Sequence, residues 1–262
     1  MWWELFHSPQ WIYGTTTPAS EVASNELLSS KVYPDSSGGS DQIVYAYNRL
    51  GQVIEQTDQN GTVRQFDYDG LGRLTDDMAT TIPTGVDNTI KRISRTYEIR
   101  GLLQNVTSYD NATPGAGSVV NDVQRVYNTF QQLQTDYQSH SGAVNTSTTP
   151  KVGYAYADGT DNTIRLETIT YPNARALNYA YGTSGSVDDL LSRVTGIGDS
   201  GTTTMVAYTK LGLDRTVVVS YVQPGIRMSY IKLSGEPVGD GGDQYTGLDR
   251  FGRVVDNRWM NS

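Results

Sequence analysis

The chain has 262 residues, enough for one large domain or two ordinary ones, and it contains 18 Tyr, 27 Gly and only 37% hydrophobic residues. This composition favours strands and turns over long helices. The formal net charge of −8 disfavours binding to nucleic-acid phosphates or to anionic lipid headgroups. Because the chain has no Cys, disulfides and thiolate metal sites are excluded.

Neither a membrane span nor a secretory signal is visible in the sequence. No stretch approaches the roughly 20 apolar residues that a membrane helix needs. Residues 1–7 also lack the basic and apolar regions of a signal peptide. We therefore expect no membrane insertion. If the protein is exported, its signal lies outside this sequence or the route uses no cleaved peptide.

A repeat organises most of the chain, in which an aromatic residue is followed four positions later by glycine. The clearest pairs are Tyr47 with Gly51, Tyr68 with Gly72, Tyr97 with Gly101, and Tyr208 with Gly212. The N-terminal stretch lacks this pattern. We therefore predict a non-repeat segment over residues 1–40 and a repeat region over residues 41–262.

Each repeat is predicted to form a β-hairpin. Tyr45 and Tyr47 are separated by one small residue, so both rings project from the same face of a strand. The following residues, Asn48 to Gly51, supply a turn opener and a glycine that tolerates positive φ, which suits a type I turn closed by a bulge. After the return strand, Asn60-Gly61 reverses the chain again. The pattern predicts an antiparallel meander with one aromatic face.

The hairpin pattern recurs with variations. Further aromatic doublets are Phe66/Tyr68, Tyr154/Tyr156 and Tyr179/Tyr181. The segment Tyr127-Asn128-Thr129-Phe130-Gln131 keeps the frame but lacks the glycine, and a last copy reads Leu248-Asp249-Arg250-Phe251-Gly252-Arg253-Val254. Residues 34–40, 81–89, 111–118 and 139–150 are rich in Ser, Thr, Gly, Asn and Pro. We predict that these stretches are surface loops rather than interdomain linkers.

A second alignment supports the repeat and locates an insertion. Residues 60–68 match residues 173–181, because each places Asn eight positions before the last aromatic residue. Both segments then resume with Arg and an apolar residue, at Arg73-Leu74 in one and at Arg193-Val194 in the other. The second turn is therefore seven residues longer (12 against 5), and we predict that residues 182–189 form a polar inserted loop.

The segment Tyr68-Asp69-Gly70-Leu71-Gly72-Arg73-Leu74, its copies along the chain, and the unit from Tyr171-Pro172-Asn173 to Tyr179-Ala180-Tyr181 resemble the bacterial Rhs/YD-repeat family. The resemblance covers about residue 40 to the end. It implies an all-β fold in which antiparallel β-hairpin repeats form part of a large spiralling β-sheet shell. In that family the shell encloses a C-terminal toxin or another cargo polypeptide, and similar eukaryotic barrels act in cell-surface adhesion.

The resemblance implies a non-catalytic structural segment of such a shell, one that would enclose or display a cargo in a longer protein. The expected partners are the remaining repeats and the cargo, at an exported or cell-surface location. Family members with a cargo carry a core segment with Asp-Pro-x-Gly-type motifs after the repeats, and this chain shows neither that segment nor a toxin. Self-cleavage and toxin activity are therefore not transferred. The alternative is a cell-surface adhesion or carbohydrate-binding module with a glycan partner.

Catalytic, cofactor and metal sites are left unassigned. His7 and His140 are the only imidazoles, and neither lies in a recognisable nucleophile motif. Asp76 and Asp77 are adjacent on a strand, so their carboxylates point to opposite faces, and Asp188/Asp189 is the other acidic pair. The Asp-rich stretches 35–41, 158–161 and 240–243 match no calcium motif and are explained by turn formation. We expect no enzyme activity, no cofactor and no metal.

Two recurring features have both a structural and a binding interpretation. Arg73, Arg193 and Arg253 would form a ligand-binding ladder, or would stack on a neighbouring Tyr and pair with an Asp one hairpin away. The tyrosine stripes would stack on sugar rings, or would pack across strands. The regular spacing favours the structural interpretation for both.

Overall fold

The computed structural model describes residues 8–15, 19–34, 36, 40–157, 164–200, 203–232, 247–249 and 251–261. Over these residues the chain is almost entirely β-sheet, with eighteen strands and a single four-residue helix. It divides into two compact units, of which the first comprises Met1–Gln132 and Asp136–Pro150, and the second Leu133–Thr135 and Lys151–Ser262. The prediction of an all-β chain of antiparallel hairpins is confirmed.

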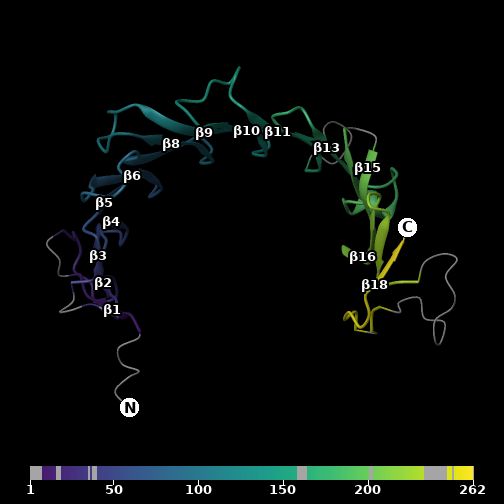
Figure 1. Ribbon diagram of the computed structural model, residues 1–262, viewed down its shortest axis with the longest axis horizontal. Coiled ribbons are helices and arrows are strands. Elements are labelled where there is room, and N and C mark those ends of the chain that lie inside the picture. The colour runs from purple at the N-terminus through teal and green to yellow at the C-terminus, as the bar shows by residue number, and fades with distance from the viewer. Residues whose placement is uncertain are drawn as a thin grey trace, which may run out of the picture. The chain divides into compact units, whose positions relative to one another are not determined.

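In the first unit the strands follow one another across the sheet in chain order (Figure 1). Every pair is antiparallel, and each strand pairs with the next along the chain. The strands are β1 Gln10–Tyr13, β2 Leu28–Val32, β3 Gln42–Tyr47, β4 Val53–Thr57, β5 Val63–Tyr68, β6 Leu74–Thr81, β7 Arg92–Tyr97, β8 Leu103–Tyr109 and β9 Val119–Tyr127. Strand β10, Leu133–Ser139, contributes residues to both units.

The second unit is a meander of the same kind, again with antiparallel pairing between consecutive strands. Its elements are β11 Lys151–Tyr156, β12 Leu166–Thr170, β13 Ala176–Ala180, α1 Val187–Leu190, β14 Gly196–Asp199, β15 Thr203–Leu211, β16 Arg215–Tyr221, β17 Ile226–Ser229 and β18 Arg258–Asn261. The helix lies in the predicted insertion, so that segment is not simply a loop. Val217, Val218 and Leu248 form a small buried cluster in this unit.

The predicted turn type is the one observed. In the first hairpin turn the amide of Asn48 donates to the carbonyl of Gln52 (2.9 Å), and the amide of Gly51 donates back to the carbonyl of Asn48 (3.0 Å). The Asn48 side-chain oxygen accepts from the amides of Leu50 and Gln52. Gly51 has φ +76°, which closes a type I turn with a bulge. The same hydrogen bonds recur at residues 58–62, 69–73, 128–132 and 249–253.

Two turns adopt this conformation without glycine. Gln131 has φ +66° at the position where the other copies carry Gly. The segment Tyr127–Gln131, which has the repeat spacing without the glycine, therefore forms the same turn. Ala174, at φ +66°, occupies the position that Gly61 holds in the aligned segment. Since left-handed backbone costs an L-residue roughly 1–2 kcal/mol, the hydrogen bonds of the neighbouring strands must outweigh that cost.

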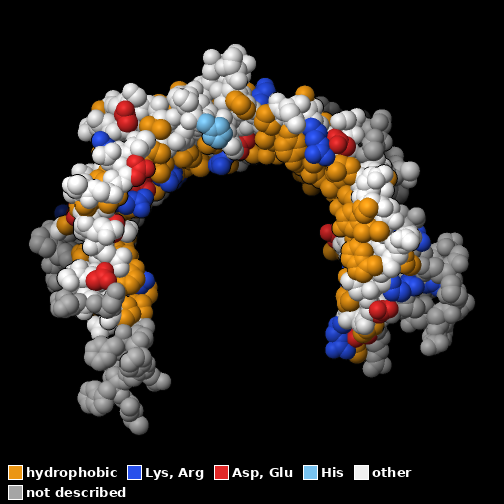
Figure 2. Space-filling view, viewed as in Figure 1, with side chains coloured by type: hydrophobic (Ala, Val, Ile, Leu, Met, Phe, Trp, Pro, Cys, Tyr) orange, Lys and Arg blue, Asp and Glu red, His pale blue; other side chains and the backbone are white. Residues whose placement is uncertain are grey.

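Strand register places the aromatic doublets of the first unit on one face of the sheet. Cross-strand partners share a face, which places Tyr45 opposite Gln56, and Phe66 opposite Asp77. The other face carries polar residues such as Glu55 opposite Gln65 and Thr107 opposite Asp122. Figure 2 shows hydrophobic side chains gathered along one face of the strands in each unit. The expectation that each aromatic doublet shares one face agrees with this register.

The predicted surface loops at residues 81–89, 111–118 and 139–150 match connections between strands, over residues 82–91, 110–118 and 140–150. The loop at 34–40 lies largely outside the described residues. The boundary after residue 40 stays a prediction, although β2 on one side of it pairs with β3 on the other. No helix in the described part of the chain has the length and apolar character needed to cross a membrane.

Exchanging the residue at the left-handed turn position tests the turn assignment. We expect Gln131→Gly to raise the free energy of unfolding by roughly 0.5–1 kcal/mol, and Gly51→Gln to lower it by about the same amount. A Cβ at Gly51 meets only the Leu27 side chain, at 3.9 Å, so backbone strain is the main effect there. Urea denaturation measures both variants. Changes of the same sign would contradict the shared turn geometry.

Candidate functional site

A ladder of tyrosine hydroxyls joins successive hairpins. The tyrosine at the end of an outgoing strand donates its hydroxyl hydrogen to a backbone carbonyl of the preceding hairpin, with O···O distances of 2.6–3.0 Å. We call these six residues the tyrosine ladder. The pairs are Tyr47 to Leu28, Tyr68 to Val53, Tyr97 to Leu74 and Tyr127 to Leu103 in the first unit, and Tyr156 to Leu133 and Tyr181 to Leu166 in the second.

A bulge in the return strand lies next to most of these acceptors. Tyr68 pairs with Leu74 while its neighbour Asp67 pairs with Asp76, so Thr75 has no cross-strand partner. The same register shift follows Val53, Leu103 and Leu166. Because a bulge interrupts the regular backbone hydrogen bonds, the adjoining carbonyl can accept from the next hairpin. The apolar residue after each turn is therefore both a strand residue and the acceptor for the following tyrosine.

Burial favours the neutral phenol at several ladder positions. Desolvation by burial is the main cause that raises the pKa of Tyr47, Tyr68, Tyr156 and Tyr181 above the ordinary value of 10.0. A neighbouring acid adds to the effect at Tyr68, where Asp77 also raises the pKa. These hydroxyls thus stay protonated, and able to donate, throughout the physiological pH range.

Guanidinium groups cover two of the ladder rings. The Arg73 guanidinium lies 4.1 Å from the centre of the Tyr97 ring, and that of Arg165 lies 5.0 Å from the centre of the Tyr181 ring. Arg73 also pairs with Asp69 in its own turn, at 2.6 Å. The predicted stacking on a neighbouring Tyr is therefore observed for Arg73. The acidic partner, however, lies four residues away in the same turn and not one hairpin away.

The other two recurring arginines also have structural contacts. Arg193 is buried, pairs with Asp188 at 2.6 Å and donates to the carbonyl of Gly212. Arg253 pairs with Asp249 at 2.7 Å and lies over the Phe251 ring. Here too the acid belongs to the same turn or to the insertion. These contacts support the structural interpretation of the arginines.

Buried charges anchor the long loops of the first unit. Arg92 is 2% exposed, donates to the carbonyls of Asn111, Thr113 and Ala116, and lies over the Tyr109 ring. Its side chain thereby holds the loop over residues 110–118. Asp122 plays the same part for residues 140–150, because it accepts from the Thr107 hydroxyl (2.7 Å) and the Val144 amide (3.1 Å).

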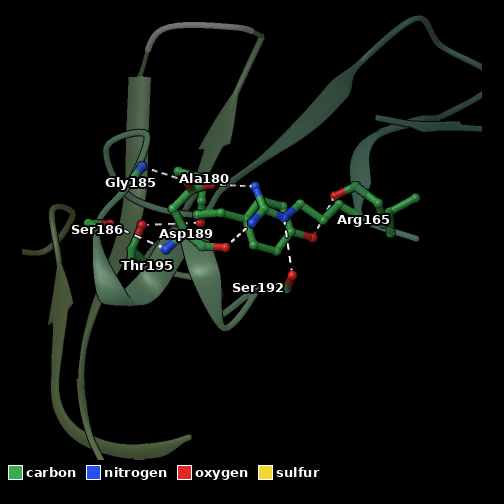
Figure 3. A network of polar contacts seen from close by, with 9 residues as sticks. Arg165, Ala180, Gly185, Ser186, Asp189, Ser192 and Thr195 are labelled. Atoms are coloured by element: carbon green, nitrogen blue, oxygen red, sulfur yellow. Dashed lines mark hydrogen bonds and ion pairs between the residues drawn. The ribbon is translucent and has the colours of Figure 1, made fainter. Parts of the chain in front are cut away.

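The insertion in the second unit is held by one arginine (Figure 3). Arg165 pairs with the carboxylate of Asp189 at 2.6 Å, donates to the Asp189 carbonyl, and reaches the Ser192 hydroxyl at 3.2 Å. Asp189 also accepts from the amide of Gly185, and this hydrogen bond is the main cause that lowers its carboxyl pKa. The helix begins with Ser186, whose hydroxyl accepts from the Asp189 amide. The network orders the inserted residues against the hairpin.

The structure places the sequence candidates for acid–base chemistry apart from one another. Asp76 accepts from the Ser94 hydroxyl, whereas Asp77 pairs with Arg64. Asp188 and Asp189 likewise form separate ion pairs, with Arg193 and with Arg165. His140 lies exposed in the loop after β10. Within the described residues there is no group of three or more His, Cys, Asp or Glu side chains that would hold a metal ion.

Several sequence candidates lie outside the described residues. These are His7, the Asp-rich stretches 158–161 and 240–243, and most of the stretch 35–41. A shallow cavity of about 280 Å³ lies beside the turn formed by Tyr171, Pro172, Asn173 and Arg175. Arg175 pairs with Asp199 at 3.1 Å, and the Asn173 side chain accepts from the Arg175 amide. The Arg175 guanidinium and the Asn173 side-chain oxygen therefore already have partners within the protein.

Comparison with known proteins identifies one segment. The family model described as RHS Repeat matches residues 47–85, which span β4, β5 and β6 with the turns between them. This match confirms the predicted resemblance for a segment that contains the motif at residues 68–74. No curated protein matches the chain in sequence.

The chain is also similar to parts of solved structures. One is a crystal structure of TcdB2-TccC3-TEV, with 12% identity, 79% of this chain and 10% of that chain covered, and a TM-score of 0.44. Another is the Photorhabdus luminescens Tc holotoxin pore, with 14% identity, 89% of this chain and 12% of that chain covered, and a TM-score of 0.43. The chain spans about a tenth of the length of these proteins.

Removing one hydroxyl of the tyrosine ladder tests its contribution. We expect Tyr97→Phe to lower the free energy of unfolding by about 1–2 kcal/mol, because it removes a 2.9 Å hydrogen bond and leaves the Leu74 carbonyl without that donor. Tyr171→Phe, at an exposed turn, is the control and should change stability by less than about 0.5 kcal/mol. Equal effects would show that the hydroxyl hydrogen bond is not stabilising.

The raised tyrosine pKa values predict a loss of stability in alkali. Because folding raises the pKa of Tyr47, Tyr68, Tyr156 and Tyr181, their contribution is complete below about pH 10 and is lost as the pH rises through the folded-state values. Urea denaturation from pH 8 to 11.5, with phenolate absorbance recorded in parallel, measures this. Changing all four residues to Phe should flatten the alkaline decline. If the four-Phe variant loses stability in alkali as steeply as the wild type, groups other than these tyrosines cause the loss.

Proposed function

We propose, from the RHS Repeat match at residues 47–85, that the hairpins of this chain are a non-catalytic structural wall that encloses or displays a cargo polypeptide, such as a C-terminal toxin, in a longer protein. Its partners are then the remaining repeats and the cargo. An exported or cell-surface location goes with this role.

The tyrosine ladder is the observation that supports this proposal. Hydroxyls of the most abundant aromatic residue in the chain are directed at backbone carbonyls of neighbouring hairpins and not at a common site. Each link joins consecutive hairpins, so adding hairpins extends the sheet without changing the contact. A structure assembled from repeated nearest-neighbour contacts suits a long wall.

The charged side chains of the described residues support the same role. Arg92 and Asp122 hold loops, Arg165 holds the insertion, and Arg73 covers a ladder ring. Catalysis requires an acid, a base or a nucleophile brought together around one point. The carboxylates and guanidinium groups described above are instead distributed along the sheet, each in a local contact.

Limited proteolysis of the natural full-length product that contains this chain tests the proposal. We expect a cargo segment attached to the wild-type repeats to resist protease. In a variant that combines Tyr68→Phe, Tyr97→Phe and Tyr127→Phe, its digestion should become at least about tenfold faster, because weakened links raise the population of opened hairpins. Tyr171→Phe is the matched control.

Two outcomes would contradict the wall. In one, the cargo is digested at the same rate with and without the ladder hydroxyls. In the other, the isolated chain binds immobilised glycans and loses that binding on Tyr179→Ala while its circular dichroism spectrum is unchanged. The second outcome would favour the adhesion or carbohydrate-binding alternative.

A further inference from the structure

Large apolar side chains stand exposed at the hairpin turns of the first unit. We call these four residues the apolar turn row. They are Leu50 (80% exposed), Leu71 (79%), Ile99 (103%) and Phe130 (66%). Each lies at one of the two central positions of a turn, in residues 48–52, 69–73, 98–102 and 128–132.

The four side chains lie along the same edge of the sheet. Consecutive antiparallel strands are joined at alternate ends, so every second connection falls at one end, and these four turns are every second connection. Neighbouring strands lie about 4.8 Å apart, so neighbouring turns are roughly 10 Å apart. Contacts between the turns confirm their order, since Gln52 donates to the Gly72 carbonyl and Arg100 to the Asn128 carbonyl.

Turn formation does not explain these residues. Turn interiors favour Gly, Asn, Asp, Ser and Pro, which adopt the backbone conformation or hydrogen-bond to it. Here the opening residue already supplies the side-chain hydrogen bonds, as Asn48 and Asp69 do. A Leu or Phe next to it adds nothing to the turn, and it exposes apolar surface to water. One such residue would be ordinary, but four at one edge mark an interaction surface.

Apart from Arg49, the charged side chains of these four turns pair locally. Two turns contain an ion pair, Asp69 with Arg73 and Glu98 with Arg100, at 2.6 and 2.7 Å. The other two turns contain an amide pair, Asn48 with Gln52 and Asn128 with Gln132, at 2.9 and 2.7 Å. Arg49 is the one remaining charge of these four turns, so two identical edges bring together a single positive charge from each copy and no larger excess. The chain as a whole carries a net charge of −8, which disfavours an anionic surface as the occupant.

We propose that the apolar turn row is a self-association surface, on which a second copy of this chain docks through its own row. Apolar side chains about 10 Å apart leave gaps between them, and the same side chains of an opposing row, offset by about half that spacing, fill those gaps. The contact is isologous, because the same residues contribute from both copies.

The available surface suits a reversible dimer. Four large apolar side chains from each copy supply on the order of 800–1,000 Å² in total, near the lower limit for a specific interface. We therefore expect dissociation in the micromolar range and not a permanent complex. Self-association through this row does not require a cargo, so its absence would leave the proposed role as a structural wall unaffected.

Sedimentation velocity of the purified chain, from 1 to 200 μM, tests the proposal. We expect a concentration-dependent dimer. A variant with Leu50→Asn, Leu71→Asn, Ile99→Ser and Phe130→Asn should dissociate at least about a hundredfold more readily, because each change removes two side chains from a symmetric contact. These turn-compatible residues should leave the circular dichroism spectrum and the melting temperature unchanged.

Val86→Asn with Ile90→Asn is the matched control, since both residues are exposed in the loop at the opposite end of the strands. This variant should dimerise like the wild type. The proposal is overturned if the wild type is monomeric at 200 μM, or if the four-residue variant dimerises equally well. Binding of the wild type, but not of the four-residue variant, to phosphatidylcholine vesicles would overturn it in favour of a lipid surface.

Discussion

The hydrogen bond from a tyrosine hydroxyl to the backbone carbonyl of the preceding hairpin is the contact on which the rest of this structure depends. An isolated two-stranded hairpin is marginally stable in water, so each repeat needs its neighbours. The tyrosine ladder supplies a contact of constant geometry between them. Donor and acceptor are separated by 15 residues at Tyr68 and by 24 at Tyr127, yet the O···O distances are 2.7 and 2.8 Å. The irregular repeat length is therefore compatible with a regular sheet.

The two ends of the strands of the first unit tolerate change differently. At the turn end, one backbone geometry serves the tyrosine ladder, the five-residue turns and the stacking of Arg73. Gln131 therefore adopts the backbone conformation of the glycine that it replaces. At the other end, loops of several lengths are accommodated, because a buried charge such as Arg92 or Asp122 reaches out from the sheet to hold each one. In the first unit the length variation therefore occurs at the end of the strands that carries no ladder contact.

Extension by repetition has a consequence for binding. The ladder tyrosines and the arginines and aspartates named above each contact a neighbouring segment, so these groups do not converge on a ligand, which agrees with the proposed structural role. The apolar turn row makes no contact that holds the hairpins together, and its side chains are exposed to solvent, with Ile99 fully exposed. Function in such a chain would reside in its edges and faces and not in a pocket.

The sequence by itself determined what depends on short spacings. Strand alternation and turn chemistry at residues such as Asn48 and Asp69 were predictable, because they rest on neighbours within about five residues. The position of the insertion was predictable because two copies of the repeat could be aligned. Only the tertiary structure decided which carbonyl each tyrosine reaches, that Arg73 pairs within its own turn, and that a short helix forms at Val187–Leu190. The apolar turn row also emerged only there, although apolar residues inside turn motifs were visible. These features depend on strand register, which brings together residues far apart in the sequence.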